Sequence, residues 1–241
     1  MSGLSWDVVL LLEVVCVVGA MVQSVVGLGL GLLAAPAVAL VAPSLAPALP
    51  VWLALMISGV MLLGERAHVD WRALAWALPA RVPGTAIGAW LVATVSDEAI
   101  SVTIGVVVLL AVALTLRTAH IPLTPTTLLT AGVVSGISGT ATSIGGPPLA
   151  VLYQRQPPEV VRSTLAVYFF VGVLISLIGL GLTGGLTASA AHIALVLFPA
   201  VLGGMLLGAL LRDRIPREQF RLVVLGLCAV SALALLARAV L

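Results

Sequence analysis

The sequence predicts an all-α membrane protein that crosses the bilayer several times. Of its 241 residues, 61% are hydrophobic and only 8% are charged, whereas a soluble domain carries about 25% charged residues. The length allows roughly eight spans of about 20 residues joined by short loops. Two apolar stretches, one in each half, are interrupted by glycine and proline. The expected fold is therefore two repeats, each a glycine-broken segment, re-entrant or hairpin, followed by three transmembrane helices.

The apolar stretches can be placed in order along the chain. Residues 7–42 are too long for one crossing at about 1.5 Å per residue, so a helix, a break and a second partial helix are expected. This first stretch lacks a positive leader and a cleavage site, which favours a membrane segment over a removed signal peptide. The further expected segments are 46–64, 73–95, 99–116, 124–153, 163–182, 188–211 and 218–238.

The stretch 132–148, GVVSGISGTATSIGGPP, holds five glycines, two prolines and several small hydroxyls. An interior glycine costs a helix about 1 kcal/mol and an interior proline about 3 kcal/mol relative to alanine. Unpaired backbone at membrane depth is tolerated where it is buried in protein or lines a wet cavity. A looser copy occupies 19–36. Paired interruptions of this kind predict the binding site of a transporter.

The two halves resemble each other at an offset of 120 residues. Identical pairs include Pro79 and Pro199, Gly84 and Gly204, and Gly88 and Gly208. The predicted repeats are residues 1–120 and 121–241. Chance similarity between helices rich in Ala, Leu and Gly is the alternative.

The arginines predict the topology. If each interrupted segment returns to the face it entered from, nine of the eleven arginines share one face: Arg66, Arg72, Arg117, Arg155, Arg162, Arg212, Arg214, Arg217 and Arg221. Arg238 is left opposite, with Asp7, Asp97 and Glu98. Eight single crossings would instead divide the arginines four against six. The positive-inside rule favours the first arrangement, which inverts the two repeats and places both termini outside.

Two charged residues are expected within the membrane. Arg81 lies about ten residues into its span, roughly 15 Å deep. A buried guanidinium faces a cavity or a partner, so Arg81 is predicted to bind an anion through its fork of donors. The alternatives are a structural pair with Glu13 or extension to the inner face. Glu13 is a candidate proton-coupling carboxylate, with structural pairing as its alternative.

The break residues complete the predicted substrate site. Proline after Gly145-Gly146 is typical of the first turn of a new helix, whose N-terminus attracts anions. For Gly84, Gly88, Gly132 and Gly136 close helix packing is the favoured interpretation. Trp52 and Tyr168 are weaker candidates for the cavity wall. The candidate substrate-binding residues are Gln23, Ser24, Gly27, Gly29, Arg81, Ser138, Thr140, Thr142, Ser143, Gly145, Gly146 and Pro147.

Several classes of function find no support in the sequence. No G-x-S-x-G, H-E-x-x-H or Walker loop occurs, and Cys16 and Cys228 stand singly in apolar spans. We therefore expect no enzyme, metal or cofactor, and no arginine cluster predicts nucleic-acid binding. The expected partners are a small anion and the lipid bilayer, with protons as a candidate coupling ion; the oligomeric state stays open.

The motifs VQSVVGLGLGLLAAP (22–36) and SGISGTATSIGGPPLAVL (135–152) resemble those of the sulfite exporter TauE/SafE family, also described as the 4-toluene sulfonate uptake permeases. The resemblance covers essentially the whole chain. It implies a multi-pass plasma-membrane transporter of small sulfur-containing anions such as sulfite, sulfoacetate or sulfonates. The resulting hypothesis is a secondary transporter working by alternating access. An anion channel, a transporter of another small anion and a membrane-embedded enzyme are the alternatives.

Overall fold

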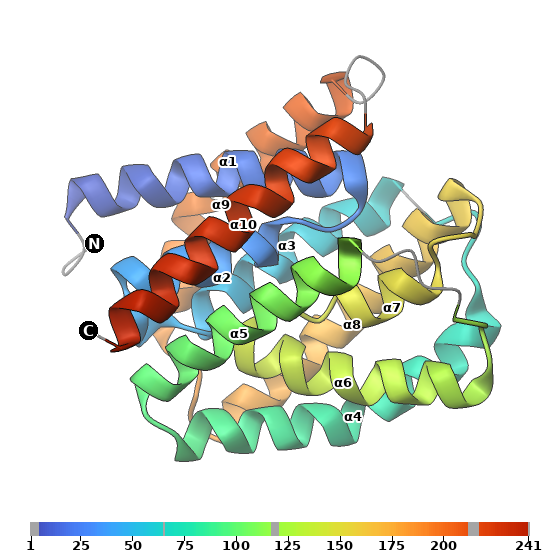
Figure 1. Ribbon diagram of the computed structural model, residues 1–241, viewed down its shortest axis with the longest axis horizontal. Coiled ribbons are helices and arrows are strands. Elements are labelled where there is room, and N and C mark those ends of the chain that lie inside the picture. The colour runs from blue at the N-terminus through green and yellow to red at the C-terminus, as the bar shows by residue number, and fades with distance from the viewer. Residues whose placement is uncertain (1–4, 65, 117–120, 212–216, 241) are drawn as a thin grey trace.

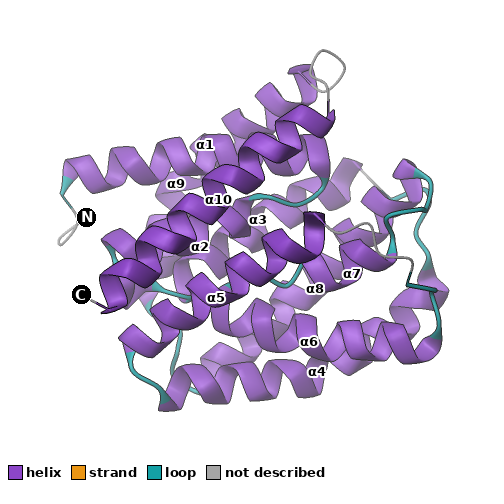
Figure 2. Ribbon diagram, in the orientation of Figure 1, coloured by secondary structure: helices purple, strands orange, loops and turns teal. Residues whose placement is uncertain are grey.

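The computed structural model describes residues 5–64, 66–116, 121–211 and 217–240, without the side chains of 26, 217–223 and 239–240. This part of the chain is helical, with short connecting loops (Figure 2). The helices are α1 (Trp6–Val26), α2 (Leu30–Val41), the 3₁₀ helix η1 (Pro43–Leu45), α3 (Ala48–Gly64), α4 (Trp71–Thr94), α5 (Asp97–Leu116), α6 (Pro125–Thr142), α7 (Pro147–Leu152), α8 (Pro158–Leu182), α9 (Ala188–Leu211) and α10 (Arg217–Val240).

Four of the described helices are long and apolar enough to cross a membrane: α1, α5, α8 and α9. Apolar side chains such as Leu182, Leu210 and Leu110 are exposed on the outside of the helices. Large exposed apolar surface in a helical bundle is typical of contact with lipid. The prediction of an all-α, multi-pass membrane protein is confirmed.

Local sequence signals explain most helix boundaries. Asp70 caps α4 by accepting a hydrogen bond of 3.0 Å from the backbone N–H of Ala73. Thr124 and Thr127 form a reciprocal capping box at the start of α6. The expected span 163–182 begins earlier, at Pro158. Proline is tolerated in the first helical turn, so the polar loop ends sooner than its composition indicates.

Two helix pairs pack with their backbones in close contact. Helix α4 runs beside α6 in Figure 1, and α1 packs along α9. A Cβ atom at Gly88 would stand 2.7 Å from the carbonyl oxygen of Ile137, and one at Gly208 would stand 2.6 Å from that of Met21. A larger residue at either position would force the helices apart, as expected for small-residue packing motifs.

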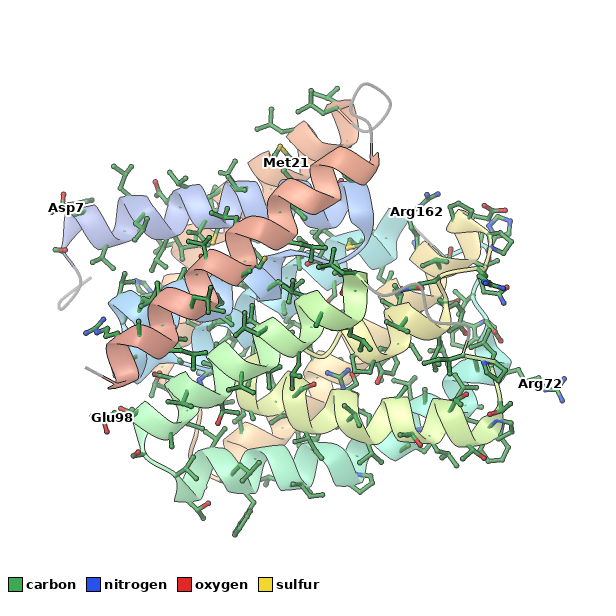
Figure 3. The ribbon with its side chains drawn as sticks, in the orientation of Figure 1. Asp7, Met21, Arg72, Glu98 and Arg162 are labelled. Atoms are coloured by element: carbon green, nitrogen blue, oxygen red, sulfur yellow. The ribbon has the colours of Figure 1, made fainter. Side chains whose placement is uncertain are left out.

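Four charged side chains mark the two ends of the bundle. Asp7 and Glu98 lie at one end, and Arg72 and Arg162 lie at the other (Figure 3). Helix α1 begins and α10 ends at the acidic end (Figure 1). The predictions for Arg117, Arg212 and Arg214, and for the side chains of Arg217 and Arg221, fall outside the described residues.

The two short helices are attached to the bundle at their far ends. Arg238 on α10 donates a hydrogen bond to the carbonyl of Leu40, in the last turn of α2. After α7, the Tyr153 hydroxyl donates to Asp70 at 3.0 Å, and the backbone N–H of Asp70 donates to Thr164 on α8, also at 3.0 Å. These contacts hold α2 and α7 in place and leave their first residues facing the interior.

Candidate functional site: a cavity between two helix interruptions

A cavity of about 60 Å³ lies where the interruption between α1 and α2 meets the interruption between α6 and α7. The two interruptions are in direct contact, because a Cβ atom at Gly31 would stand only 2.6 Å from the carbonyl oxygen of Ser143. The residues that line the cavity are Gln23, Leu28, Gly29, Gly31, Leu32, Val51, Ala54, Arg81, Gly139, Ser143, Ile144, Gly145, Gly146, Pro147, Phe169 and Val173.

The first interruption is organised by Gln23. Helix α1 is capped by Gly27, whose φ of 92° is left-handed and favours glycine. The side-chain oxygen of Gln23 accepts a hydrogen bond of 3.0 Å from the backbone N–H of Leu30, the first residue of α2. The Gln23 side-chain nitrogen lies 3.6 Å from the sulfur of Met61. Gln23 therefore spans the gap between the two helices while lining the cavity.

The second interruption contains a strained serine. Ser143 has φ 63° and ψ 12°, the left-handed conformation that a residue with a Cβ adopts at an energetic disadvantage. Among the described residues, Ser143 is the one non-glycine residue with a positive φ. Its hydroxyl oxygen is buried and has no hydrogen-bond partner. Orphaned polar atoms of this kind are uncommon in folded proteins and point to a ligand or water.

Arg81 supplies the charge of the cavity. Its side chain, on α4, is 2% exposed, and its Nη1 donates a hydrogen bond of 2.9 Å to the hydroxyl of Ser135 on α6. Its Cζ stands 5.0 Å from the ring centroid of Tyr168 on α8, a cation–π distance. Its Nε is buried without a partner. Within the described part of the chain, no carboxylate pairs with this guanidinium.

Glycines from three segments surround the Arg81 guanidinium. A Cβ atom at Gly139 would lie 2.8 Å from Nη2, and one at Gly145 would lie 3.2 Å from the same atom. A Cβ atom at Gly172 would lie 2.6 Å from Nη1. We call Gly139, Gly145 and Gly172 the glycine slot. Because any side chain there would collide with the planar group, the slot sets both its position and its orientation.

A buried chain of hydroxyls lies one helical turn beyond the slot. The Thr140 hydroxyl is 2.9 Å from that of Ser176 and 3.3 Å from that of Thr85. Ser176 in turn donates to the carbonyl oxygen of Gly172 at 3.0 Å. This chain joins α4, α6 and α8 one turn away from Arg81.

The residues singled out from the sequence divide into two groups. Gln23, Gly29, Arg81, Ser143, Gly145, Gly146 and Pro147 line the cavity together. The other candidates do not line it. Gly27 caps α1, Ser24 packs against Gly208, and Thr140 belongs to the hydroxyl chain. Ser138 and Thr142 donate to carbonyls of their own helix.

Three further candidates also lie away from the cavity wall. Glu13 is partly buried on α1 and does not pair with Arg81. Trp52 does not line the cavity, and its indole nitrogen is buried without a partner. Tyr168 contacts Arg81 instead of the cavity.

Sequence reasoning did not single out several residues of the site. Ser135 is one of the small hydroxyl residues of the 132–148 stretch, but the sequence did not identify it as the partner of Arg81. Gly139 lies within the recognised motif, whereas Gly172 and Phe169 belong to an ordinary apolar span. No local pattern marks Gly172, because its role depends on the approach of a side chain from α4.

These features define a class of protein. The chain is an all-helical, multi-pass membrane protein with a buried cationic cavity at its centre, an arrangement found among membrane transporters. The chain belongs to the sulfite exporter TauE/SafE family, whose model matches residues 11–235. No curated protein and no solved structure matches it. The match confirms the resemblance drawn from the two motifs and places the chain in a family of transporters.

Proposed function

We propose that this protein is a secondary transporter that moves small sulfur-containing anions across the plasma membrane. The substrate binds in the central cavity and is carried by alternating access. The observation that carries this proposal is the burial of the Arg81 guanidinium at the cavity, where none of the described residues gives it a carboxylate partner.

The buried positive charge of Arg81 favours the binding of an anion. Transfer of an unpaired ion from water into a protein interior costs several kcal/mol, and an opposite charge nearby offsets that cost. The cavity is where such a charge fits, because the other sides of the guanidinium meet Ser135, Tyr168 and the glycine slot. The planar fork of arginine matches the oxygens of a sulfite or sulfonate group. The unpaired Ser143 hydroxyl supplies a further donor on the cavity wall.

Inverted repeats at residues 1–120 and 121–241 are supported by reciprocal helix packing. Gly84 of α4 packs against Val133 of α6, and Gly204 of α9 packs against Val17 of α1. Each pair joins the first helix of one half to a later helix of the other half. Under this proposal, the paired helices move as units about the two interruptions during alternating access.

The separation of charge supports the proposed orientation. With Arg72 and Arg162 at one end and Asp7 and Glu98 at the other, the positive-inside rule places the arginine end in the cytoplasm. Both termini are then outside.

Glu13 remains the candidate for proton coupling, because it is a partly buried carboxylate within the apolar helix α1. In proteoliposomes, Glu13→Gln is expected to abolish accumulation driven by a proton gradient while anion binding is retained.

Binding to purified protein in lipid nanodiscs tests the central claim. Isothermal titration calorimetry with sulfite and methanesulfonate is expected to show binding that Arg81→Lys weakens and Arg81→Ala weakens further. Loss of a charged hydrogen-bonding partner corresponds to about 10- to 150-fold in affinity. Arg72→Ala, at an exposed arginine, is the matched control. Wild-type affinity in Arg81→Ala would refute the site.

A transport assay separates the transporter from the anion channel. An inwardly directed proton gradient across proteoliposomes should drive uphill accumulation by a coupled transporter. A channel would only dissipate the anion gradient.

A further inference from the structure

We propose that the cavity selects singly charged oxyanions over doubly charged ones. This inference rests on the proposed function, since it concerns which anions the central site accepts. It separates a sulfonate of one negative charge, or hydrogen sulfite, from sulfate and from sulfoacetate, which each carry two.

The described wall of the cavity carries a single charged side chain. Among the described residues that line the cavity, Arg81 is the one ionisable group. Tyr168 contacts the guanidinium through the face of its ring. The repeat offset pairs Arg81 with Val201, a buried apolar residue on α9. The second half therefore contributes no matching cation.

Apart from Arg81, the wall of the cavity is largely apolar. The side of the cavity formed by α3 and α8 is apolar, with Val51, Ala54, Phe169 and Val173. The Gln23 side-chain oxygen accepts from Leu30 and its side-chain nitrogen donates to the sulfur of Met61, which leaves one N–H of the amide free. Among the described residues of the wall, Arg81 at its Nε and Ser143 at its hydroxyl have a buried polar atom without a hydrogen-bond partner. This set neutralises one negative charge and hydrogen-bonds few oxygens.

The free energy of binding depends on the net charge that is left beside the buried Arg81. One anionic charge beside Arg81 leaves the cavity neutral, whereas a second leaves a buried net charge with no counterion. The cavity of about 60 Å³ holds few waters to compensate for it. The apolar wall also accommodates the methyl group of methanesulfonate, where sulfate would place a charged oxygen.

Titration calorimetry on the wild-type protein in nanodiscs tests this selection. We expect methanesulfonate to bind at least tenfold more tightly than sulfate, with the same affinity at pH 6 and pH 8. Sulfite should bind roughly tenfold more weakly at pH 8 than at pH 6, because hydrogen sulfite loses its proton near neutral pH and only the singly charged fraction is competent. Methanesulfonate has no proton to lose in this range, so it controls for titration of the protein.

The outcomes separate this inference from the proposed function. Sulfate binding as tight as methanesulfonate, with both lost in Arg81→Ala, would overturn charge selection and leave the anion site intact. Sulfite affinity independent of pH would also overturn it. Failure of methanesulfonate, sulfite and sulfate to bind at either pH would overturn the proposed function and this inference with it.

Discussion

The guanidinium of Arg81 on α4 lies directly against the backbone of Gly172 on α8. A Cβ atom at Gly172 would stand 2.5 Å from Nε and 2.6 Å from Nη1, so only glycine leaves room for the side chain in this position. The contact also aligns the guanidinium with the Ser135 hydroxyl, which Nη1 reaches at 2.9 Å. The anion site that we propose therefore requires glycine at position 172 as well as the charge of Arg81.

Substitution Gly172→Ala is therefore expected to weaken anion binding by tenfold or more. The added methyl group displaces the guanidinium, and overpacking of this kind costs about 1 to 3 kcal/mol. Titration calorimetry with methanesulfonate measures the affinity, and circular dichroism checks that the protein remains helical. Gly203→Ala is the matched control, because a Cβ atom there has no neighbour within 4 Å. Wild-type affinity in Gly172→Ala would show that the slot does not position Arg81 for binding.

The unpaired hydroxyl of Ser143 makes a second prediction. Ser143→Ala should reduce affinity by roughly 2- to 12-fold, the equivalent of one hydrogen bond worth about 0.5 to 1.5 kcal/mol. Ser143→Gly should reduce affinity similarly and raise thermal stability, because glycine adopts the left-handed conformation without strain. Ser138→Ala should leave binding unchanged, since Ser138 donates to the carbonyl of Val134. Equal binding by all three variants and the wild type would remove Ser143 from the site.

The reciprocal glycine contacts predict matched losses of stability. Gly84→Ala and Gly204→Ala each force a methyl group into the backbone of the facing helix, at Val133 and Val17 respectively. Each is expected to destabilise the protein by about 1 to 3 kcal/mol, seen as a lower temperature of thermal unfolding. Gly226→Ala, where a Cβ atom meets nothing within 4 Å, should have no such effect. A clear loss in only one of the two glycine variants would count against equivalent repeats.

The proposed orientation can be measured by cysteine labelling. The native Cys16 and Cys228 are buried and can be replaced by alanine to give a clean background. In right-side-out vesicles, an impermeant maleimide should label a cysteine introduced at Glu98 without permeabilisation. A cysteine at Arg72 should react only after the membrane is opened. The reverse pattern would place the arginine end outside.

Much of the fold was predictable because membrane insertion imposes strong local rules. Apolar runs must be helical when no water can pair with their backbone, so α3, α5 and α9 appear within about two residues of the expected segments. Glycine and proline interruptions likewise indicate where helices end, as at Gly27 and Pro147. Errors arose where a helix begins in polar sequence, as α8 does at Pro158.

The site was predictable only in part, because whether a residue lines the cavity depends on which face of its helix packs against which neighbouring helix. Ser143 and Ser138 belong to one motif, yet one hydroxyl is unpaired at the cavity and the other bonds its own helix. Thr140 was predicted to bind the substrate, whereas its hydroxyl is hydrogen-bonded to those of Thr85 and Ser176.

The sequence by itself determined that this chain is a multi-pass helical membrane protein with two interrupted segments and a buried arginine. Those properties follow from hydropathy, helix propensity and charge, which act over neighbouring residues. The tertiary structure alone decided that Arg81 meets Ser135 and Gly172 instead of Glu13, and that the two interruptions enclose one cavity. These contacts join residues distant in the chain, and they depend on helix packing geometry that no local pattern encodes.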